Sequence, residues 1–249
     1  MAEDGTLRGM RVLVTGGTGS IGRAMCRAFA REGADLAFTW NRREAEAGAL
    51  AAELQGRGVR ALHGRVGATD GPAIQAFCER VETELGALDA LVNNLGGTQV
   101  LPFALIDEPD WDETLALNLK SMFLFSKAVV RGMIRRKAGV ILNLGSLAGR
   151  RMLEVPVHYA TAKAGVTGFT ISLAKELARY GIRVLELTPG LIQGGIGDNV
   201  SERQLAEYNR YCALGRPGTA EEVAELAAFL ISPRAGYMNA VSVQLDGGL

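Results

Sequence analysis

The fold is decided by residues 14–22, VTGGTGSIG, which follow a short apolar run and open a segment with a helical pattern. Four glycines in nine residues are costly inside a helix or strand, because glycine loses the most conformational freedom on folding. A glycine turn between a strand and a helix lets the backbone approach a phosphate group, and the helix N-terminus adds free N–H groups. The stretch predicts a pyrophosphate-binding turn; a tight turn without a ligand is the alternative.

Two glycine patterns overlap in this turn. Gly17, Gly19 and Gly22 fit the dinucleotide-binding spacing G-x-G-x-x-G, and Gly16, Gly19 and Gly22 are evenly spaced. The residues expected around the phosphates are Gly16, Thr18, Gly19, Ser20, Ile21 and Gly22.

The rest of the chain alternates apolar, β-rich runs with helical patterns. Strands are predicted at residues 12–15, 36–39, 59–63, 88–92, 140–144, 184–187 and 241–245. Helices are predicted at residues 22–32, 43–55, 71–85, 111–137, 159–180 and 221–230. This alternation predicts an α/β fold: one doubly wound, Rossmann-like parallel sheet flanked by helices, in a single domain over residues 1–249. Ligands of such sheets bind at the carboxyl ends of the strands.

Composition excludes several classes of function. Lys plus Arg and Asp plus Glu both number 27, so there is no net charge to favour nucleic acid or an anionic membrane. The start of the chain is too polar for a signal peptide, and no apolar run is long enough to span a membrane. Three scattered cysteines and two isolated histidines predict a cytoplasmic protein without disulfides or a metal site: Cys26, Cys78, Cys212, His63 and His158.

The end of the second predicted strand indicates which dinucleotide binds. An NAD site is expected to place an acidic residue about 20 residues after the glycine turn, but the sequence reads TWNRR at 39–43. Arg42 or Arg43, which follow Asn41, can pair with a 2′-phosphate, so NADP(H) is favoured over NAD(H). In the alternative interpretation, the arginines only begin a solvated helix.

Tyr159 and Lys163 are candidates for acid–base chemistry. They stand four residues apart on a predicted helix and therefore share a face. A nearby ammonium favours phenolate and is expected to lower the tyrosine pKa from about 10. Ser146 follows a strand end and could bind a carbonyl oxygen, and Asn118 is a polar residue in the middle of a helix. An ordinary helix surface and a capping or buried asparagine are the alternatives.

Taken together, these motifs resemble the short-chain dehydrogenase/reductase family over almost the whole chain. The glycine turn, NNLG at 93–96, Asn118, Ser146, YATAK at 159–163, PG at 189–190 and DGG at 246–248 occur in family order. The chain is most similar to 3-oxoacyl-(acyl-carrier-protein) reductases and related single-domain ketoreductases.

The resemblance implies a catalytic tetrad. Tyr159 would give a proton to a carbonyl oxygen that Ser146 binds. Lys163 would lower the tyrosine pKa and bind the nicotinamide ribose, and Asn118 would hold a water that links Lys163 to solvent. Further cofactor contacts are implied at Arg65, Val66, Asn93, Gly96, Pro189, Gly190 and Ile192.

Several positions depart from the family pattern, among them Ser20, Leu95, Arg65, Gly194 and the pair Asn239 and Ala240. Ser20 replaces the middle glycine of the turn, Arg65 replaces an aspartate that contacts adenine, and Gly194 replaces a threonine near the nicotinamide. They favour a specialised biosynthetic ketoreductase over a housekeeping enzyme.

The leading hypothesis is NADPH-dependent reduction of a β-keto thioester or polyketide-like ketone, with Tyr159 as general acid. An NAD(P)-dependent dehydrogenase of sugars, steroids or other secondary alcohols is the second hypothesis, and a non-catalytic dinucleotide-binding sensor is the third. The substrate is expected to be a small molecule or carrier-bound, with a lid at 191–214 and basic residues at 135–137 and Lys175 for the carrier. Arg150, Arg151 and Met152 are expected near the pocket mouth, and a homotetramer or homodimer is implied.

Overall fold

The computed structural model describes residues 5–148 and 155–249, within which seven strands form one parallel sheet. Arg150, Arg151 and Met152 lie outside the described residues. The strands are β1 (Arg11–Val14), β2 (Asp35–Trp40), β3 (Ala61–Arg65), β4 (Ala90–Asn93), β5 (Gly139–Leu144), β6 (Ile182–Pro189) and β7 (Ser242–Leu245). Their order across the sheet is β3-β2-β1-β4-β5-β6-β7, which confirms the predicted doubly wound fold.

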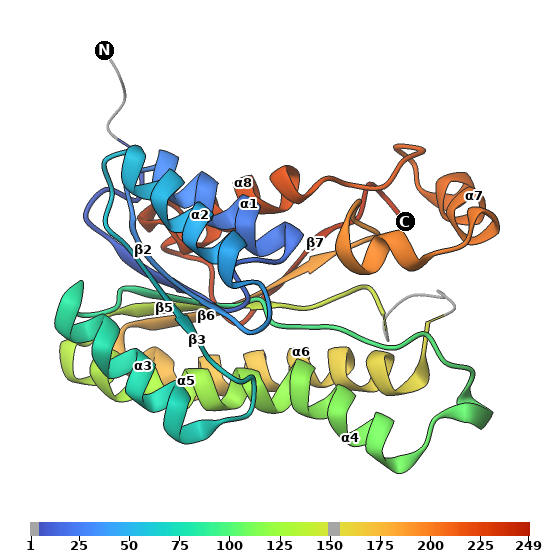
Figure 1. The fold of residues 1–249 in the computed structure, drawn as a ribbon, viewed down its shortest axis with the longest axis horizontal. Coiled ribbons are helices and arrows are strands. Elements are labelled where there is room, and N and C mark those ends of the chain that lie inside the picture. The colour runs from blue at the N-terminus through green and yellow to red at the C-terminus, as the bar shows by residue number, and fades with distance from the viewer. Residues whose placement is uncertain (1–4, 149–154) are drawn as a thin grey trace.

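Helices cover both faces of this sheet (Figure 1). The α-helices are α1 (Ser20–Arg31), α2 (Glu44–Gly56), α3 (Gly71–Glu84), α4 (Glu108–Leu115), α5 (Ser121–Arg136), α6 (Val157–Leu177), α7 (Glu202–Tyr211) and α8 (Ala220–Ile231). On one face lie α1, α2 and α8, and on the other lie α3, α4, α5 and α6 (Figure 1). Two buried apolar clusters fill the two interfaces, because a sheet covered on both sides has apolar residues on both sides of its strands.

The sequence locates the elements better than it locates their ends. The third strand lies at Ala61–Arg65 rather than at 59–63, because its pairing with β2 continues to Trp40 opposite Arg65. The predicted helix at 111–137 begins earlier, at a capping box that joins Asp107 to Asp110. It contains a π-helical segment, Ala116–Lys120, between α4 and α5.

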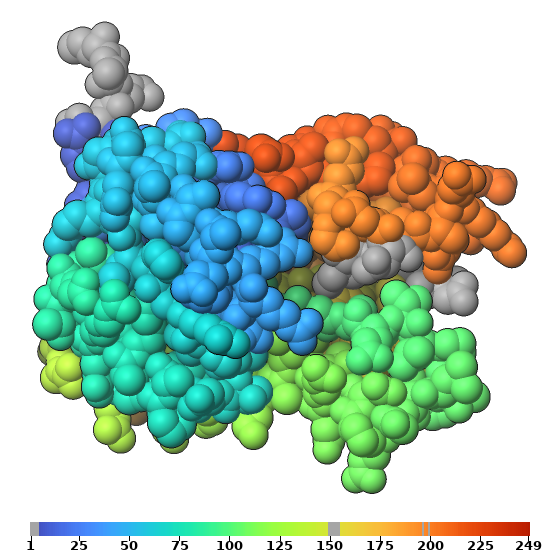
Figure 2. Space-filling model, viewed as in Figure 1, coloured from blue at the N-terminus to red at the C-terminus, as the bar shows by residue number. Residues whose placement is uncertain are grey.

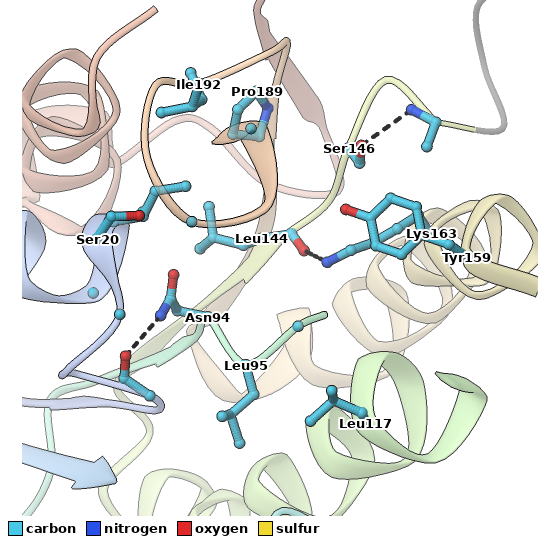
Figure 3. A pocket seen from close by; sticks show the side chains of 18 of the residues that line it. Ser20, Asn94, Leu95, Leu117, Leu144, Ser146, Tyr159, Lys163, Pro189 and Ile192 are labelled. Atoms are coloured by element: carbon cyan, nitrogen blue, oxygen red, sulfur yellow. Dashed lines mark hydrogen bonds between the residues drawn. The ribbon is translucent and has the colours of Figure 1, made fainter. Parts of the chain in front are cut away.

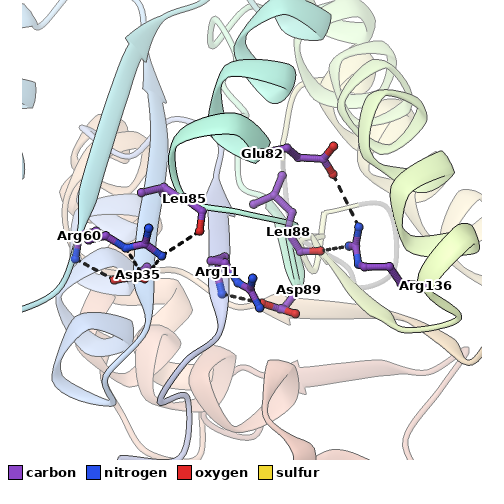
Figure 4. Close-up of polar contacts among 8 residues, drawn as sticks. All are labelled: Arg11, Asp35, Arg60, Glu82, Leu85, Leu88, Asp89 and Arg136. Atoms are coloured by element: carbon purple, nitrogen blue, oxygen red, sulfur yellow. Dashed lines mark hydrogen bonds and ion pairs between the residues drawn. The ribbon is translucent and has the colours of Figure 1, made fainter.

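The amino-terminal edge of the sheet is held by charged side chains (Figure 4). Arg11 bonds Asp89 at 2.8 Å, and Arg60 bonds Asp35 and the Leu85 carbonyl. Arg136, at the end of α5, donates to a carbonyl just before β4. These side chains satisfy backbone N–H and C=O groups near the starts of the strands. A ligand site is therefore expected at the opposite edge, where the strands end.

Candidate active site

A cavity of about 1330 Å³ opens at the carboxyl ends of the strands. Figure 2 shows a hollow between the blue amino-terminal region, the green segment around α4 and the orange segment around α7. Single-ligand pockets usually measure about 300–1,000 Å³, so the space suits a cofactor together with a substrate. The expected residues that line it are Gly16, Thr18, Gly19, Ser20, Ile21, Gly22, Asn41, Arg42, Val66, Gly96, Ser146, Tyr159, Lys163, Pro189, Gly190 and Ile192.

The glycine turn joins β1 to α1 with a backbone that side chains would obstruct. Gly16 has a φ of +68°, which favours glycine, and its N–H donates to Thr39 Oγ1 at 3.0 Å. A Cβ at Gly22 would collide with the Gly16 carbonyl oxygen, so close packing of helix on turn requires glycine there. The α1 N-terminus has no side-chain cap, and its first turn carries no acidic residue. These are the properties of an anion site, and they fit a dinucleotide pyrophosphate.

Asn94, which directly follows β4, holds this turn in place. Asn94 Nδ2 donates to the Thr15 and Gly16 carbonyls at 2.9 and 3.3 Å (Figure 3). Thr15 Oγ1 accepts from the N–H groups of Asn94 and Leu95. The end of β4 therefore fixes the turn on β1, at the point where the strand order reverses.

The cavity wall after β2 is basic. Arg42 and Arg43 both line the cavity and are exposed. Arg43 reaches back to the Thr18 carbonyl at 3.4 Å and forms an ion pair with Glu46 at 3.5 Å. Arg42 makes no hydrogen bond or ion pair with a described residue, so its guanidinium can bind a ligand without breaking a contact. Both arginines that the sequence predicts for the 2′-phosphate therefore line the cavity.

Two expected cofactor residues do not line the cavity. Arg65 is exposed at the end of β3, opposite Trp40 in the neighbouring strand. Asn93 is 2% exposed, and its Nδ2 donates to Ser126 Oγ and Asn143 Oδ1. Asn93 therefore crosslinks elements beneath the site rather than facing the cavity.

Tyr159 and Ser146 both line the cavity, and their side chains point toward each other (Figure 3). Tyr159 lies in the first turn of α6, and Ser146 follows β5, where its Oγ accepts from the Ala148 N–H at 3.1 Å. Burial raises the pKa of Tyr159, and hydrogen bonding to Ser146 acts in the opposite direction. The expected lowering of the tyrosine pKa by Lys163 is not seen in the protein alone, because burial dominates.

Lys163 is buried one turn beyond Tyr159 on α6. Its Nζ donates to the Leu144 carbonyl at 2.9 Å and lies 5.8 Å from the centre of the Tyr159 ring. Burial lowers the pKa of Lys163 from its ordinary 10.5 to about 8, and the Glu186 carboxylate opposes this shift. The lysine side chain is therefore positioned to act on the tyrosine at a pH close to neutral.

Asn118 lies in the π-helical segment and is fully buried. Its Nδ2 donates to the Gly97 and Thr114 carbonyls at 2.7 and 2.8 Å, and its Oδ1 accepts from the Gly97 N–H. A Cβ at Gly96 would stand 2.9 Å from Asn118 Oδ1 and 3.2 Å from Lys163 Nζ. Asn118 does not line the cavity. Its hydrogen bonds hold the loop that contains Gly96 and Gly97, and this loop lies between Asn118 and Lys163. The role of Asn118 in holding a water stays a prediction.

The predicted lid loop contains a helix that the sequence analysis missed. Helix α7 begins at a capping box formed by Ser201 and Gln204, a signal that could have identified it. Tyr208 anchors α7, because its hydroxyl accepts from the Leu191 N–H at 3.1 Å and donates to the Asp246 carbonyl at 3.2 Å. Tyr208, Tyr211 and the terminal Leu249 line the cavity, which gives this wall an amphipathic character.

The described residues contain neither a membrane-spanning helix nor a cluster of metal ligands. The helices within 5–148 and 155–249 include none with the length and hydropathy that a membrane span requires. Nor do the His, Cys, Asp and Glu side chains of these ranges form a group of three that could hold a metal ion. His63 instead accepts a hydrogen bond from Trp40, and Cys26, Cys78 and Cys212 are buried free thiols.

Comparisons with known proteins agree with this geometry. Residues 10–205 match the family model described as short chain dehydrogenase. A doubly wound sheet with a glycine turn, a Tyr–Lys pair and a facing serine defines a dinucleotide-dependent oxidoreductase. The chain belongs to the short-chain dehydrogenase/reductase family.

The relatives include reductases of acyl-carrier-protein substrates. The chain is 35% identical over 246 residues to the 3-oxoacyl-[acyl-carrier-protein] reductase FabG of Chlamydia pneumoniae, covering 99% of both chains. It is 35% identical to the protein of the same name from Escherichia coli, covering 97% of both. It is also 34% identical to nodulation protein G of Rhizobium meliloti, covering 98% of both.

Solved structures share the fold closely. A short-chain dehydrogenase/reductase from Serratia marcescens is 30% identical with a TM-score of 0.90, covering 98% of both chains. A blue fluorescent protein from a metagenomic library, in complex with NADPH, is 31% identical with the same score and coverage. The chain is therefore an NAD(P)-dependent oxidoreductase that acts on CH–OH or C=O groups.

Proposed function

We propose that this enzyme uses NADPH to reduce a ketone, a β-keto thioester or polyketide-like compound, to a secondary alcohol. The observation that carries the proposal is the convergence of Ser146, Tyr159 and Lys163 on one wall of the cavity that also contains the glycine turn. The relatives named as 3-oxoacyl-[acyl-carrier-protein] reductases support this class of substrate.

The residues fit NADPH at both of its ends. The α1 N-terminus and the glycine turn would hold the pyrophosphate, and Arg42 would pair with the 2′-phosphate. Gly96 keeps side-chain atoms away from Lys163, which would bind the nicotinamide ribose. When bound there, NADPH supplies the hydride.

The protein residues supply binding and the proton. Ser146 donates a hydrogen bond to the carbonyl oxygen of the substrate, and Tyr159 gives its phenolic proton to that oxygen as the alcohol forms. The Lys163 ammonium favours the resulting phenolate, and Asn118 maintains the loop beside Lys163.

Part of the cavity lining is apolar. Leu117 and Leu147 line it, as does Tyr211 of the lid. These apolar side chains suit an acyl or polyketide chain.

Steady-state rates test the proposal. Acetoacetyl thioester with NADPH should give turnover, and NADH should give a lower kcat/KM. A panel of sugars, steroids and simple secondary alcohols with NAD and NADP provides the comparison. Faster turnover of that panel would replace the ketoreductase by a secondary-alcohol dehydrogenase, and NADPH binding without any turnover would indicate a sensor.

We further propose a cytoplasmic homotetramer or homodimer. The three buried free thiols support a reducing compartment. Exposed apolar side chains on the outer helices support self-association, since Phe123, Val157 and Ile171 are 46%, 43% and 44% exposed. Light scattering of the purified protein measures the assembly directly.

A further inference from the structure

A row of polar side chains crosses the sheet beneath the active site. Asn93, Asn143, Glu186 and Ser242 are register partners on four successive strands, β4 to β7. Asn143 and Glu186 are fully buried, and Asn93 is 2% exposed. Glu186 is the one ionisable member of this row. A buried carboxylate is costly unless hydrogen bonds and an opposite charge stabilise it, so its position calls for a physical reason.

Glu186 lies against the backbone that carries the catalytic groups. A Cβ at Gly145 would collide with Glu186 Oε1, so the carboxylate packs directly on the residue between Leu144 and Ser146. Leu144 supplies the carbonyl that accepts from Lys163 Nζ. Thr167, one turn beyond Lys163 on α6, donates to Glu186 Oε1 at 3.3 Å. The same short segment of β5 and the same face of α6 therefore contact both the carboxylate and the lysine.

Among the described groups that act on Lys163, only one carries a negative charge. On its own helix the nearest titratable group is Tyr159, whose pKa is raised by burial, so it is neutral at pH 7. From β5 the lysine meets a carbonyl, and near Gly96 it meets the amide of Asn118. Among the described residues, Glu186 is the only carboxylate that raises the pKa of Lys163 against the effect of burial.

We propose that Glu186 is a positioning residue, whose buried carboxylate keeps Lys163 charged in the working enzyme and so acts on Tyr159 through Lys163. The inference rests on the proposed role of Lys163 in the reduction. An ammonium beside Tyr159 stabilises phenolate, whereas a neutral amine does not. Without the carboxylate, Lys163 would lose its proton at a lower pH and the tyrosine would lose this support.

Three substitutions separate charge from shape. Glu186→Gln is nearly isosteric and neutral, Glu186→Met is neutral and apolar, and Glu186→Asp keeps the charge. For each protein, the pH dependence of kcat/KM and of the NADPH dissociation constant is measured between pH 6 and pH 9.5. In both neutral variants, the fall of these profiles at high pH should begin about one pH unit lower than in the wild type. In Glu186→Asp it should begin at the same pH as in the wild type. At pH 8.5 this shift amounts to about a tenfold loss relative to wild type, with little change at pH 6.

The alternatives give different outcomes. A merely structural role would lower the melting temperature or the rate equally at every pH, and an unmoved basic limb in both neutral variants would overturn the proposal. If Glu186→Gln does not fold, Glu186→Met provides the same measurement. If the wild-type enzyme reduces no ketone, the proposed function fails, whereas the pH dependence of NADPH binding still decides the role of Glu186.

Discussion

Replacing Lys163 by methionine should change how the stability of the protein depends on pH. Burial lowers the pKa of Lys163 from 10.5 to about 8 in the folded protein. One pKa unit corresponds to about 1.4 kcal/mol, so the folded state bears a cost of about 3 kcal/mol for holding the charged lysine at pH 7. Methionine has a similar length and no charge, so it removes this cost together with the hydrogen bond to Leu144.

The sign of the pH effect follows from the number of protons bound in each state. Below pH 8 the lysine is charged in both the folded and the unfolded chain, and the cost is present in full. Between pH 8 and pH 10.5 the unfolded chain binds the extra proton, so the free energy of unfolding of the wild type rises with pH. The variant lacks this group. Wild-type stability minus variant stability should therefore increase by about 3 kcal/mol between pH 7 and pH 10.5.

Urea unfolding, followed by the fluorescence of Trp40 and Trp111, measures this difference at both pH values. Other groups that titrate in this range are common to both proteins and cancel in the comparison. Lys175→Met, which removes an exposed lysine on the same helix, is the matched control. A change below about 1 kcal/mol for Lys163→Met would mean that water solvates the lysine, and the argument from burial would fail.

Three further substitutions test the rest of the site. Tyr159→Phe should lower kcat about 10²- to 10⁴-fold while NADPH binding stays near wild type, and substantial turnover of this variant would exclude Tyr159 as the general acid. Arg42→Ala should weaken NADPH binding about tenfold or more with little effect on NADH, measured by fluorescence titration; equal losses would rule out a 2′-phosphate contact. Tyr208→Phe removes the bonds to Leu191 and Asp246 and should raise KM more than it lowers kcat, because α7 loses its anchor; unchanged kinetics would show that the anchor is dispensable.

The sequence was sufficient for the fold because the relevant signals are local. A strand covered on both faces reads as an apolar run, and all seven such runs are strands in the structure. The position of the glycine turn was predicted too, and the structure shows that Gly16 makes the turn and Gly22 permits close packing. The lid helix α7 was missed because its sequence is mostly polar, which resembles a loop unless the capping box is noticed.

The polar row beneath the site could not be predicted, because strand register creates it. Asn93, Asn143, Glu186 and Ser242 are separated by about 40 to 60 residues in the chain, and nothing local relates one to another. The same limit applies to the electrostatics of Tyr159 and Lys163. Their spacing predicts a shared helix face, but the balance between burial and nearby charge depends on β5 and β6.

The expected carrier contacts at residues 135–137 and the cavity lie at opposite edges of the sheet. Arg136 donates to the Leu88 carbonyl before β4, whereas Lys163 binds the Leu144 carbonyl at the far end of β5. Five steps along β5 separate these levels by about 17 Å. A substrate on a carrier that docks at residues 135–137 would have to pass around the sheet to reach the cavity of the same chain, whereas a neighbouring copy could offer a shorter route.

Carrier docking at this helix end therefore depends on assembly, which makes it testable. Arg135→Glu should lower kcat/KM for a carrier-bound β-keto thioester and leave the free thioester unaffected, because residue 135 is far from the cavity. The loss should shrink at high salt, since exposed charges are screened. Equal kinetics of wild type and variant with the carrier-bound substrate would place the docking surface elsewhere, and the cavity mouth between α4 and α7 would then be the surface to examine.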